Sequence, residues 1–291
     1  AFGFELWVNG QFIGQHNSTF TRSEFDITQV VRCGSENLVV VKIDRRRRGW
    51  NFDCHDDWAL SGIYRDVIVF SVPQQNISDY TVTSRLRTDG VATVQIQAVI
   101  TSSLAAIQQA DLFIQLLSPT GTAVAQSQKT ISAEQQSVIA DHIFEVASPE
   151  LWSAEKPSLY TLRIQLKNLD GSLHSVRQNI GIRQVCVVGD ILEINSVPVK
   201  LKGVNHHDLH YEVGRAMRRE HFLNDIKLMK KANINTVRTS HYPADPVLIE
   251  LCDQMGLYVI SEVPFGKRQN HLQDPDYLQD LYQRAEATVM R

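Results

Sequence analysis

Two hydrophobic periods divide the chain, and this division constrains the fold more than any other feature. From residue 1 to about 183, apolar and polar residues alternate in short runs that are separated by turn signals such as Asn9-Gly10. This period of two is typical of β-strands and hairpins. From about residue 184, short apolar runs alternate three times with helical patterns. Such an order predicts parallel strands joined by right-handed crossovers.

The β part divides again, which predicts three domains at 1–74, 75–183 and 184–291. The first has short, irregularly spaced runs, including 24–28, 37–44 and 64–72. The second has regular alternating runs, as in an immunoglobulin-like sandwich. In the third, strands are expected at 201–205, 234–240 and 257–263, and helices at 220–233, 245–256 and 275–291. The last helix is expected to carry one apolar stripe of Leu278, Leu281, Tyr282, Ala285 and Val289.

Composition excludes some classes of protein. The chain has 29 basic and 32 acidic residues and a net charge of -3, so it has no global attraction to nucleic acid or to an anionic membrane. No apolar run reaches the roughly 18 residues that span a bilayer. The four cysteines are scattered without a CxxC pair, which favours free thiols and a cytoplasmic protein. Four arginines at 45–48 predict a solvated loop, with a subunit contact or attraction of acidic sugars as alternatives.

The two ends of the sequence suggest a piece of a longer protein. It starts without Met inside AFGFELWV, which is typical of a strand and not of a signal peptide. We therefore expect a natural N-terminus further upstream. The three strand-helix units are too few to close a barrel, so we expect the rest of a barrel or doubly wound sheet beyond Arg291.

Polar and ionisable residues follow all three predicted parallel strands. They occupy positions 205–208, 238–241 and 261–262. Because the carboxyl ends of parallel strands form the functional face of such units, these groups predict one site. A single histidine at a strand end is more often structural than functional. Arg238 also has a structural alternative, which is an ion pair with Glu262 across neighbouring strands.

The residue types at these strand ends suit recognition of a polyol. Charged and neutral hydrogen-bonding groups around an apolar floor bind sugar hydroxyls. Phosphate binding is less well matched, because the sequence has no glycine-rich loop followed by Lys-Ser/Thr. A zinc site is an alternative, since imidazole is a common ligand, although no HExxH motif is present. Its candidate ligands are His206, His207, His210 and His241.

Several stretches together resemble glycoside hydrolase family 2, the β-galactosidase and β-glucuronidase family. They follow the family's order along nearly the whole chain: WVNGQFIG (7–14), EFDIT (24–28), DDWALSGIYRDV (56–67), LWSAEKPSLYTL (151–162), LKGVNHHD (201–208), VRTSHYP (237–243) and DQMGLYVISEV (253–263). The resemblance implies a multidomain β plus α/β protein. Its parts would be a partial jelly-roll sugar-binding domain, an immunoglobulin-like sandwich and the start of a TIM (β/α)8 barrel.

The resemblance also implies substrate-binding residues. His207 and His241 resemble the two histidines that contact galactose, and Arg238 resembles the arginine that holds the nucleophile carboxylate. Asp56 resembles the sugar-domain aspartate that reaches the galactose site and a sodium ion, so sodium is the one ion expected. Glu262 lies on the third strand and is interpreted as a carboxylate that contacts the substrate or supports residues that do, and not as a catalyst. Trp50 and Trp58 are candidates for stacking on sugar, with core packing as the alternative.

Two departures from the β-galactosidase pattern bear on the substrate. Gly266 and Arg268 replace residues of the family's magnesium site, so magnesium is not expected. His206 stands where the family usually has arginine. Galactose therefore remains open against another β-linked sugar.

The implied function is retaining hydrolysis of terminal β-linked sugars by two carboxylates about 5 Å apart. The family takes this pair from the fourth and seventh barrel strands, so we expect no catalytic residue in this chain and no activity of the chain alone. β-Galactosidase is favoured, with β-glucuronidase or another β-glycosidase as an alternative. A non-catalytic carbohydrate-binding protein is the rival from another class. The expected partner is a β-linked glycoside, within a parent protein that is a candidate homo-oligomer.

Overall fold

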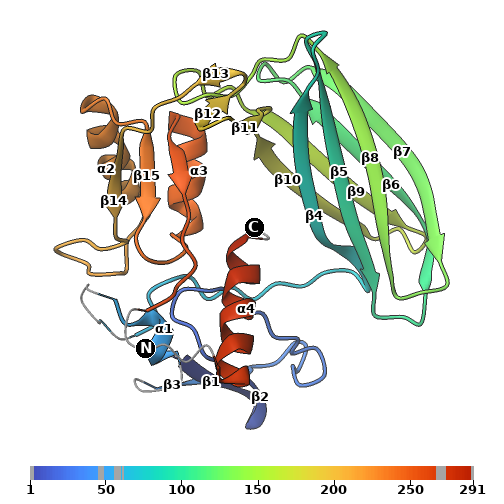
Figure 1. The fold of residues 1–291 in the computed structure, drawn as a ribbon. Coiled ribbons are helices and arrows are strands. Elements are labelled where there is room, and N and C mark those ends of the chain that lie inside the picture. The colour runs from blue at the N-terminus through green and yellow to red at the C-terminus, as the bar shows by residue number, and fades with distance from the viewer. Residues whose placement is uncertain (1–2, 45–48, 56–59, 61, 267–272, 290–291) are drawn as a thin grey trace. The chain divides into compact units, whose positions relative to one another are not determined.

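Two compact units make up the chain in the computed structural model, which describes residues 3–44, 49–55, 60, 62–266 and 273–289. One unit combines 1–67, 202–252 and 258–291, and the other combines 68–201 and 253–257. The first unit is therefore interrupted in sequence by nearly all of the second. Each unit has its own sheets (Figure 1).

The second unit is an antiparallel sandwich of seven long strands. Its sheets have the orders β10-β9-β6-β7 and β4-β5-β8. Strict alternation builds its core, since β5 buries every second side chain from Ala92 to Ser102. The core draws on both sheets, which confirms the predicted sandwich. The strands are β4 (Gln75–Leu86), β5 (Val91–Ser102), β6 (Ile107–Leu117), β7 (Ala123–Ala133), β8 (Ser137–Ala147), β9 (Tyr160–Asn168) and β10 (Leu173–Ile180).

Two of these strands, β7 and β10, were not expected from the sequence. Both lie at the edges of their sheet. β7 buries only Ile131, and β10 has no fully buried side chain. An edge strand needs few apolar residues, so its sequence lacks a clear alternating pattern. A small antiparallel sheet of β11 (Val185–Val188), β12 (Ile191–Ile194) and β13 (Val197–Pro198) follows.

The start of the first unit is a three-stranded antiparallel sheet with the order β2-β1-β3. Its elements are β1 (Gly3–Val8), β2 (Gln11–His16) and β3 (Val39–Asp44), followed by the short helix α1 (Trp50–Asp53). The hairpin predicted at Asn9-Gly10 is confirmed, and both residues have the positive φ (52° and 83°) that a tight hairpin turn requires.

Two further predicted strands in this region are wrong. Residues 24–28 and 64–72 pair with no other strand among the described residues. The apolar side chains that predicted the second of these strands are exposed, with Val69 the most exposed at 76%. An apolar run forms a strand only if a neighbouring backbone completes its hydrogen bonds. The described residues supply no such neighbour.

The rest of the first unit consists of three parallel strands alternating with three helices, as predicted. β14 (Gly203–His206), β15 (Thr236–Thr239) and β16 (Tyr258–Ile260) pair in that order, and Arg238 lies opposite both Asn205 and Ile260. The helices are α2 (Arg219–Lys231), α3 (Pro246–Met255) and α4 (Pro275–Val289). Gly256 ends α3 with a φ of 77°, as expected of a glycine after a helix.

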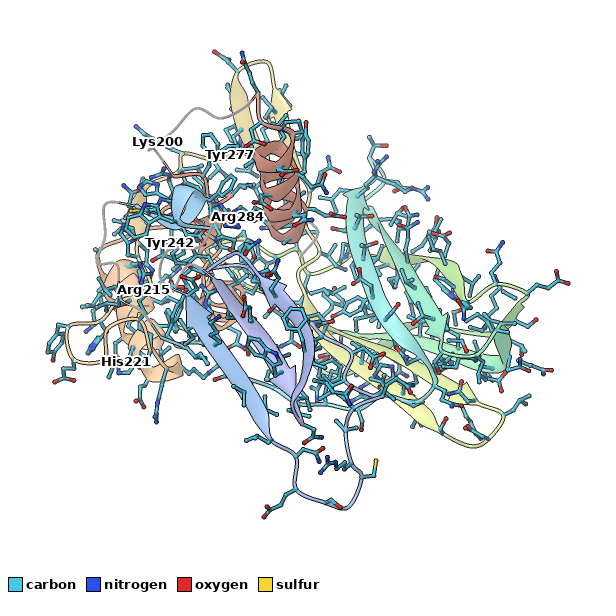
Figure 2. The ribbon with its side chains drawn as sticks, turned by 90° about the horizontal axis from the view of Figure 1, so that it is seen from below. Lys200, Arg215, His221, Tyr242, Tyr277 and Arg284 are labelled. Carbon is cyan, nitrogen blue, oxygen red and sulfur yellow. The ribbon has the colours of Figure 1, made fainter. Side chains whose placement is uncertain are left out.

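The buried face of the last helix differs from the prediction. α4 buries Tyr277 and Arg284, whereas Tyr282 and Val289 of the predicted stripe are 64% and 73% exposed. A polar contact determines which face of α4 is buried, because Arg284 donates a hydrogen bond to the backbone oxygen of Asn17 at 2.7 Å. Tyr277 stacks on Phe52 with ring centroids 4.3 Å apart. Figure 2 shows both residues on α4.

Two general expectations can also be compared with the structure. None of the four cysteines forms a disulfide. In the described part of the chain, no helix is both long and apolar enough to cross a bilayer.

Candidate functional site

The carboxyl ends of β15 and β16 carry a connected group of three ionisable side chains. Arg238, at the end of β15, forms an ion pair with Glu262, which follows β16. The second carboxylate oxygen of Glu262 lies 2.9 Å from His241 Nδ1. The ion pair that was the structural alternative is therefore present. It does not bury the group, since all three side chains are partly exposed.

His207 joins this group from the end of β14. Its ring centroid lies 5.9 Å from that of His241, in an edge-to-face arrangement. Its Nδ1 lies 3.2 Å from the hydroxyl of Tyr242. The structure thus brings together four of the five predicted substrate-binding residues, on one rim of the parallel sheet.

Other sequence-predicted positions lie outside the described residues. They include Asp56, the fifth predicted substrate-binding residue and the candidate sodium ligand. Trp58, Arg268 and the arginines at 45–48 are also outside. Trp50 opens α1 and is half-buried.

A histidine that sequence reasoning missed also lies at this rim. The ring of His55, which follows α1, is 5.5 Å from that of His241 and 5.8 Å from that of Phe20. A lone histidine in a loop carries no local signal. Only its position just before Asp56 could have drawn attention to it.

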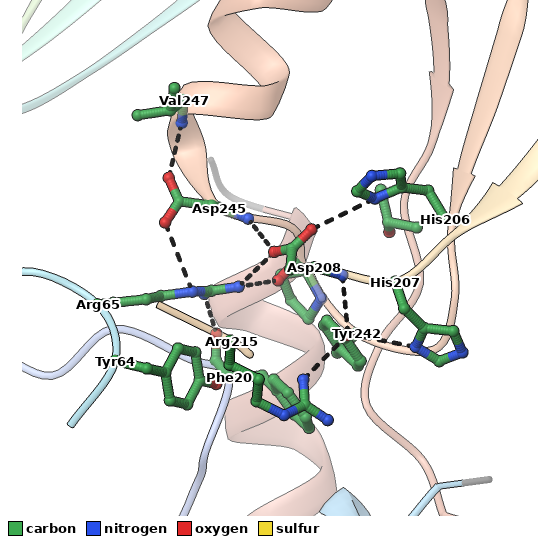
Figure 3. A network of polar contacts seen from close by, with 12 residues as sticks. Phe20, Tyr64, Arg65, His206, His207, Asp208, Arg215, Tyr242, Asp245 and Val247 are labelled. Carbon is green, nitrogen blue, oxygen red and sulfur yellow. Dashed lines mark hydrogen bonds and ion pairs between the residues drawn. The ribbon is translucent and has the colours of Figure 1, made fainter. Parts of the chain in front are cut away.

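Beneath the rim, the carboxylate of Asp208 is a point of convergence (Figure 3). It accepts hydrogen bonds from Arg65 at 3.1 Å and from the backbone N–H of Asp245 at 2.7 Å. His206 Nδ1 lies 3.5 Å from its other oxygen. Burial alone would raise the pKa of Asp208, but the bond from His206 and the charge of Arg65 outweigh burial and lower it. Asp208 is therefore a buried anion that several donors stabilise.

Arg65 connects the segment 1–67 to the strand ends. Besides Asp208, its guanidinium donates to the carbonyl oxygens of Phe20 and Pro243, each at 2.9 Å. It also lies 3.9 Å from Asp245. The planar fork of arginine allows one side chain to hold several acceptors at once. Arg65 thereby fixes the loop that follows β14 and carries His207.

His206 supplies a second positive charge. Its Nε2 lies 3.1 Å from Asp225 of α2. Burial would lower the pKa of His206, but the neighbouring carboxylates of Asp208 and Asp225 outweigh burial and raise it to about 9. The imidazole is therefore charged at neutral pH.

Stacked aromatic rings support Tyr242 next to the site. Phe20 and Tyr242 lie parallel, with ring centroids 3.8 Å apart and an angle of 2°. The buried guanidinium of Arg215 lies 5.2 Å from the Phe20 ring and 5.3 Å from the Tyr242 ring. Cation–π contacts of this kind are strongest where water is excluded. Sequence reasoning missed Phe20 and Arg215, because neither lies in a strand-end motif.

The described residues do not assemble the alternative zinc site. Within the ranges that the structure describes, no three or more His, Cys, Asp or Glu side chains are grouped so that they could hold a metal ion. His206 instead faces two carboxylates, and the His210 and His221 rings are tilted by 39° with centroids 4.5 Å apart.

Fold and site together define a multidomain protein in which a β-sandwich accompanies a βα-barrel segment with a polar rim at its strand ends. Family models agree with this description over almost the whole chain. Residues 2–73 match the sugar binding domain of glycosyl hydrolases family 2, residues 75–183 match the model described as glycosyl hydrolases family 2, and residues 185–289 match the family's TIM barrel domain. The chain belongs to glycosyl hydrolases family 2.

The curated relatives that match the chain include β-galactosidases. A β-galactosidase of Priestia megaterium is 38% identical over 266 residues, which cover 89% of this chain and 25% of that protein. A β-galactosidase of Halalkalibacterium halodurans is 37% identical over 264 residues, with the same coverage of 89% and 25%. The chain thus spans about a quarter of the length of these curated relatives.

The solved structures that resemble it include β-glucuronidases. That of Bacteroides uniformis superposes with a TM-score of 0.90 at 25% identity, over 99% of this chain and 36% of the other. That of Ruminococcus gnavus in complex with D-glucuronic acid gives a TM-score of 0.86 at 27% identity, over 99% of this chain and 50% of the other.

Proposed function

We propose that this chain forms the sugar-binding part of a retaining glycoside hydrolase that acts on terminal β-linked sugars, with β-galactosides as the first choice. The main observation behind the proposal is that four side chains contact one another on one rim of the parallel sheet, namely His207, Arg238, His241 and Glu262. The β-galactosidase names of the curated relatives support the choice of sugar. We also propose domain boundaries at 74/75 and 183/184.

In this proposal, His207 and His241 hydrogen-bond to sugar hydroxyls, and Asp56 contributes from the first domain, with sodium as its ion. The two carboxylate oxygens of Glu262 face Arg238 and His241. A retaining mechanism requires one protonated carboxylic acid and one carboxylate nucleophile. A glutamate paired with an arginine is poorly suited to donate a proton. Glu262 is therefore not the acid, and in this proposal it serves as a contact or positioning group while the chain by itself is inactive.

β-Glucuronides are the second candidate substrate, because solved β-glucuronidases share this fold and one of them is a complex with D-glucuronic acid. A carbohydrate-binding protein without catalysis is the alternative of another class. Both alternatives place a sugar on the same rim and differ in the sugar or in turnover.

The test is binding and turnover by the 291-residue chain. Methyl β-galactoside and methyl β-glucuronide are titrated by NMR, and the nitrophenyl β-glycosides of both sugars are assayed for hydrolysis. We expect β-galactoside binding that His241→Ala weakens about tenfold or more, the effect of losing one hydrogen bond to a charged or polar partner. His174→Ala, in the sandwich, is the control. Absence of binding to either sugar contradicts the site, and turnover that Glu262→Gln abolishes contradicts the non-catalytic role of Glu262.

A further inference from the structure

The connection between β14 and α2 contains a short hairpin that carries an exposed tyrosine. His210 and Gly214 pair across the hairpin through two backbone hydrogen bonds of 2.8 Å each. A Cβ atom on Gly214 would lie 2.8 Å from Cδ1 of Leu60, so the hairpin backbone packs directly against that side chain. Tyr211 lies within the hairpin and is 82% exposed. The paired and packed backbone therefore presents a large ring to solvent.

Tyr211 belongs to a group of three neighbouring rings. The centroid of the His210 ring lies 4.4 Å from that of Tyr211 and 4.5 Å from that of His221 in α2. Both imidazoles bond to the backbone, since His210 Nδ1 accepts from the N–H of Glu212 at 3.3 Å. His221 Nδ1 accepts from the N–H of Arg218 at 2.8 Å. A tyrosine has two side-chain torsions, so one that already contacts a bonded ring loses little conformational entropy when a ligand binds.

The hairpin lies at the same end of the parallel sheet as the candidate site. It follows the carboxyl end of β14, and Tyr211 is four positions after His207 (Figure 1). Consecutive Cα atoms are about 3.8 Å apart, so those of His207 and Tyr211 are separated by at most about 15 Å. The chain also turns between them, because the N–H of Leu209 donates to His207 O at 2.8 Å. A ligand longer than one monosaccharide can therefore reach both residues.

We propose that Tyr211 is a specificity-determining residue, which contacts the ring of the leaving group to which the terminal sugar is linked. This inference rests on the proposed function, in which a terminal β-linked sugar occupies the rim. Such a sugar continues only through its anomeric oxygen, so a ring bound beyond it belongs to the leaving group. An aromatic face packs against another aromatic ring or against the C–H face of a sugar. Tyr211 offers such a face and contributes little burial to the fold.

The test compares ligands that differ only in the leaving group. Methyl and phenyl β-galactoside are titrated by NMR into the 291-residue chain, and methyl and phenyl β-glucuronide form a second pair. We expect Tyr211→Ala to weaken binding of the phenyl glycoside roughly three- to tenfold, the range of aromatic ring pairs, and to change the methyl glycoside by less than about twofold. Tyr211→Phe keeps the ring and should bind both ligands as the unaltered chain does.

A control variant and a second readout make the test specific. Tyr282→Ala is the control, because Tyr282 is also an exposed tyrosine, at 64%, and lies on α4. It should change the affinity of neither ligand. Intermolecular nuclear Overhauser effects should connect the phenyl protons to the Tyr211 ring. Equal losses of both glycosides in Tyr211→Ala would show a general disturbance of the rim and would contradict a contact with the leaving group.

The inference and the proposed function can fail in different ways. If the methyl glycosides bind and Tyr211→Ala leaves the phenyl glycosides unaffected, the proposed function stands and this inference is wrong. If no glycoside of either sugar binds, the proposed function is wrong and the inference fails with it.

Discussion

His206 carries a positive charge that it loses at high pH. Its pKa is raised from 6.5 to about 9 by Asp208 and Asp225, which outweigh burial. A group whose pKa is higher in the folded than in the unfolded state stabilises the fold fully below the unfolded value. That stability is lost as the pH rises through the folded value. His206 therefore loses its stabilising contribution between pH 6.5 and about 9.

We expect His206→Gln to lower the free energy of unfolding by about 3 kcal/mol at pH 6, because each pKa unit corresponds to about 1.4 kcal/mol. The loss should shrink steadily and vanish above pH 9. Urea titrations of both proteins at several pH values measure it. Asp225→Asn removes one of the two anions and should shift the window to lower pH. A constant difference across the whole range would show that His206 is not charged.

Arg65 should be worth far more than an ordinary surface arginine. Arg65→Ala leaves the buried Asp208 without one of its donors, and breaking such a pair costs about 3 kcal/mol or more. Arg87 is the control, because it pairs with Asp89 and Glu145 at the surface. Exposed pairs contribute about 0 to 1 kcal/mol. Equal losses in chemical denaturation of Arg65→Ala and Arg87→Ala would contradict the importance of the Asp208 contacts.

Sequence reasoning predicted the residues at the rim of the candidate site but missed the residues that support them. Arg238, His241 and His207 were predicted because residues at the carboxyl ends of parallel strands meet in space. Phe20, Arg215 and Arg65 support Tyr242 and Asp208 from other parts of the chain. No local pattern connects residue 20 with residue 242, so only the folded chain reveals that pairing.

Among the elements, α4 is attached through a polar contact, although its sequence suggested an apolar one. Arg284 is 4% exposed and lies 3.3 Å from Asp53 and 4.4 Å from the Phe52 ring. Burial raises the pKa of Asp53 to about 6, even though Arg284 and Thr19 oppose the shift. Burying the two charges of Arg284 and Asp53 costs desolvation free energy, and removing either one leaves the other buried without its charged partner.

Arg284→Ala should destabilise the protein by about 3 to 5 kcal/mol at pH 8, since it leaves a buried carboxylate without its partner. The loss should be smaller at pH 5, where Asp53 takes up a proton and no longer carries charge. Arg219→Ala on α2 is the control, because Arg219 pairs with Glu250 at the surface and should cost less than about 1 kcal/mol. A loss that is independent of pH would contradict this account of Asp53.

The helices and strands show where an apolar pattern is reliable. α2 buries Phe222, Ile226 and Met229, because a helix between neighbouring strands packs by its apolar stripe. In α4 a single ion pair overrides that stripe. In the sandwich, β5 was predicted from strict alternation, whereas the edge strands β7 and β10 bury too little to be recognised.

At the scale of the whole molecule, two units with separate interiors should respond separately to mutation. Ile164 is fully buried in the sandwich core, so Ile164→Ala should cost about 2 to 5 kcal/mol in the unfolding of that unit. Ile143→Ala is the control, because Ile143 is 63% exposed. Calorimetry should show that Ile164→Ala and Arg65→Ala lower different transitions. A common shift of one transition would mean that the units unfold together.

The interruption of the first unit also has a consequence for synthesis on the ribosome. Arg65 and its partner Asp208 are 143 positions apart, which corresponds to roughly 7 to 30 s of translation at about 5 to 20 residues per second. The sandwich has most of its chain during this interval and can fold in milliseconds to about a second. Residues 1–67 must wait with Phe20 and Arg65 lacking the partners that β14 and β15 later bring. The nascent chain thus passes through a stage in which a segment made later completes one made earlier, and a chaperone that protects residues 1–67 would act in that interval.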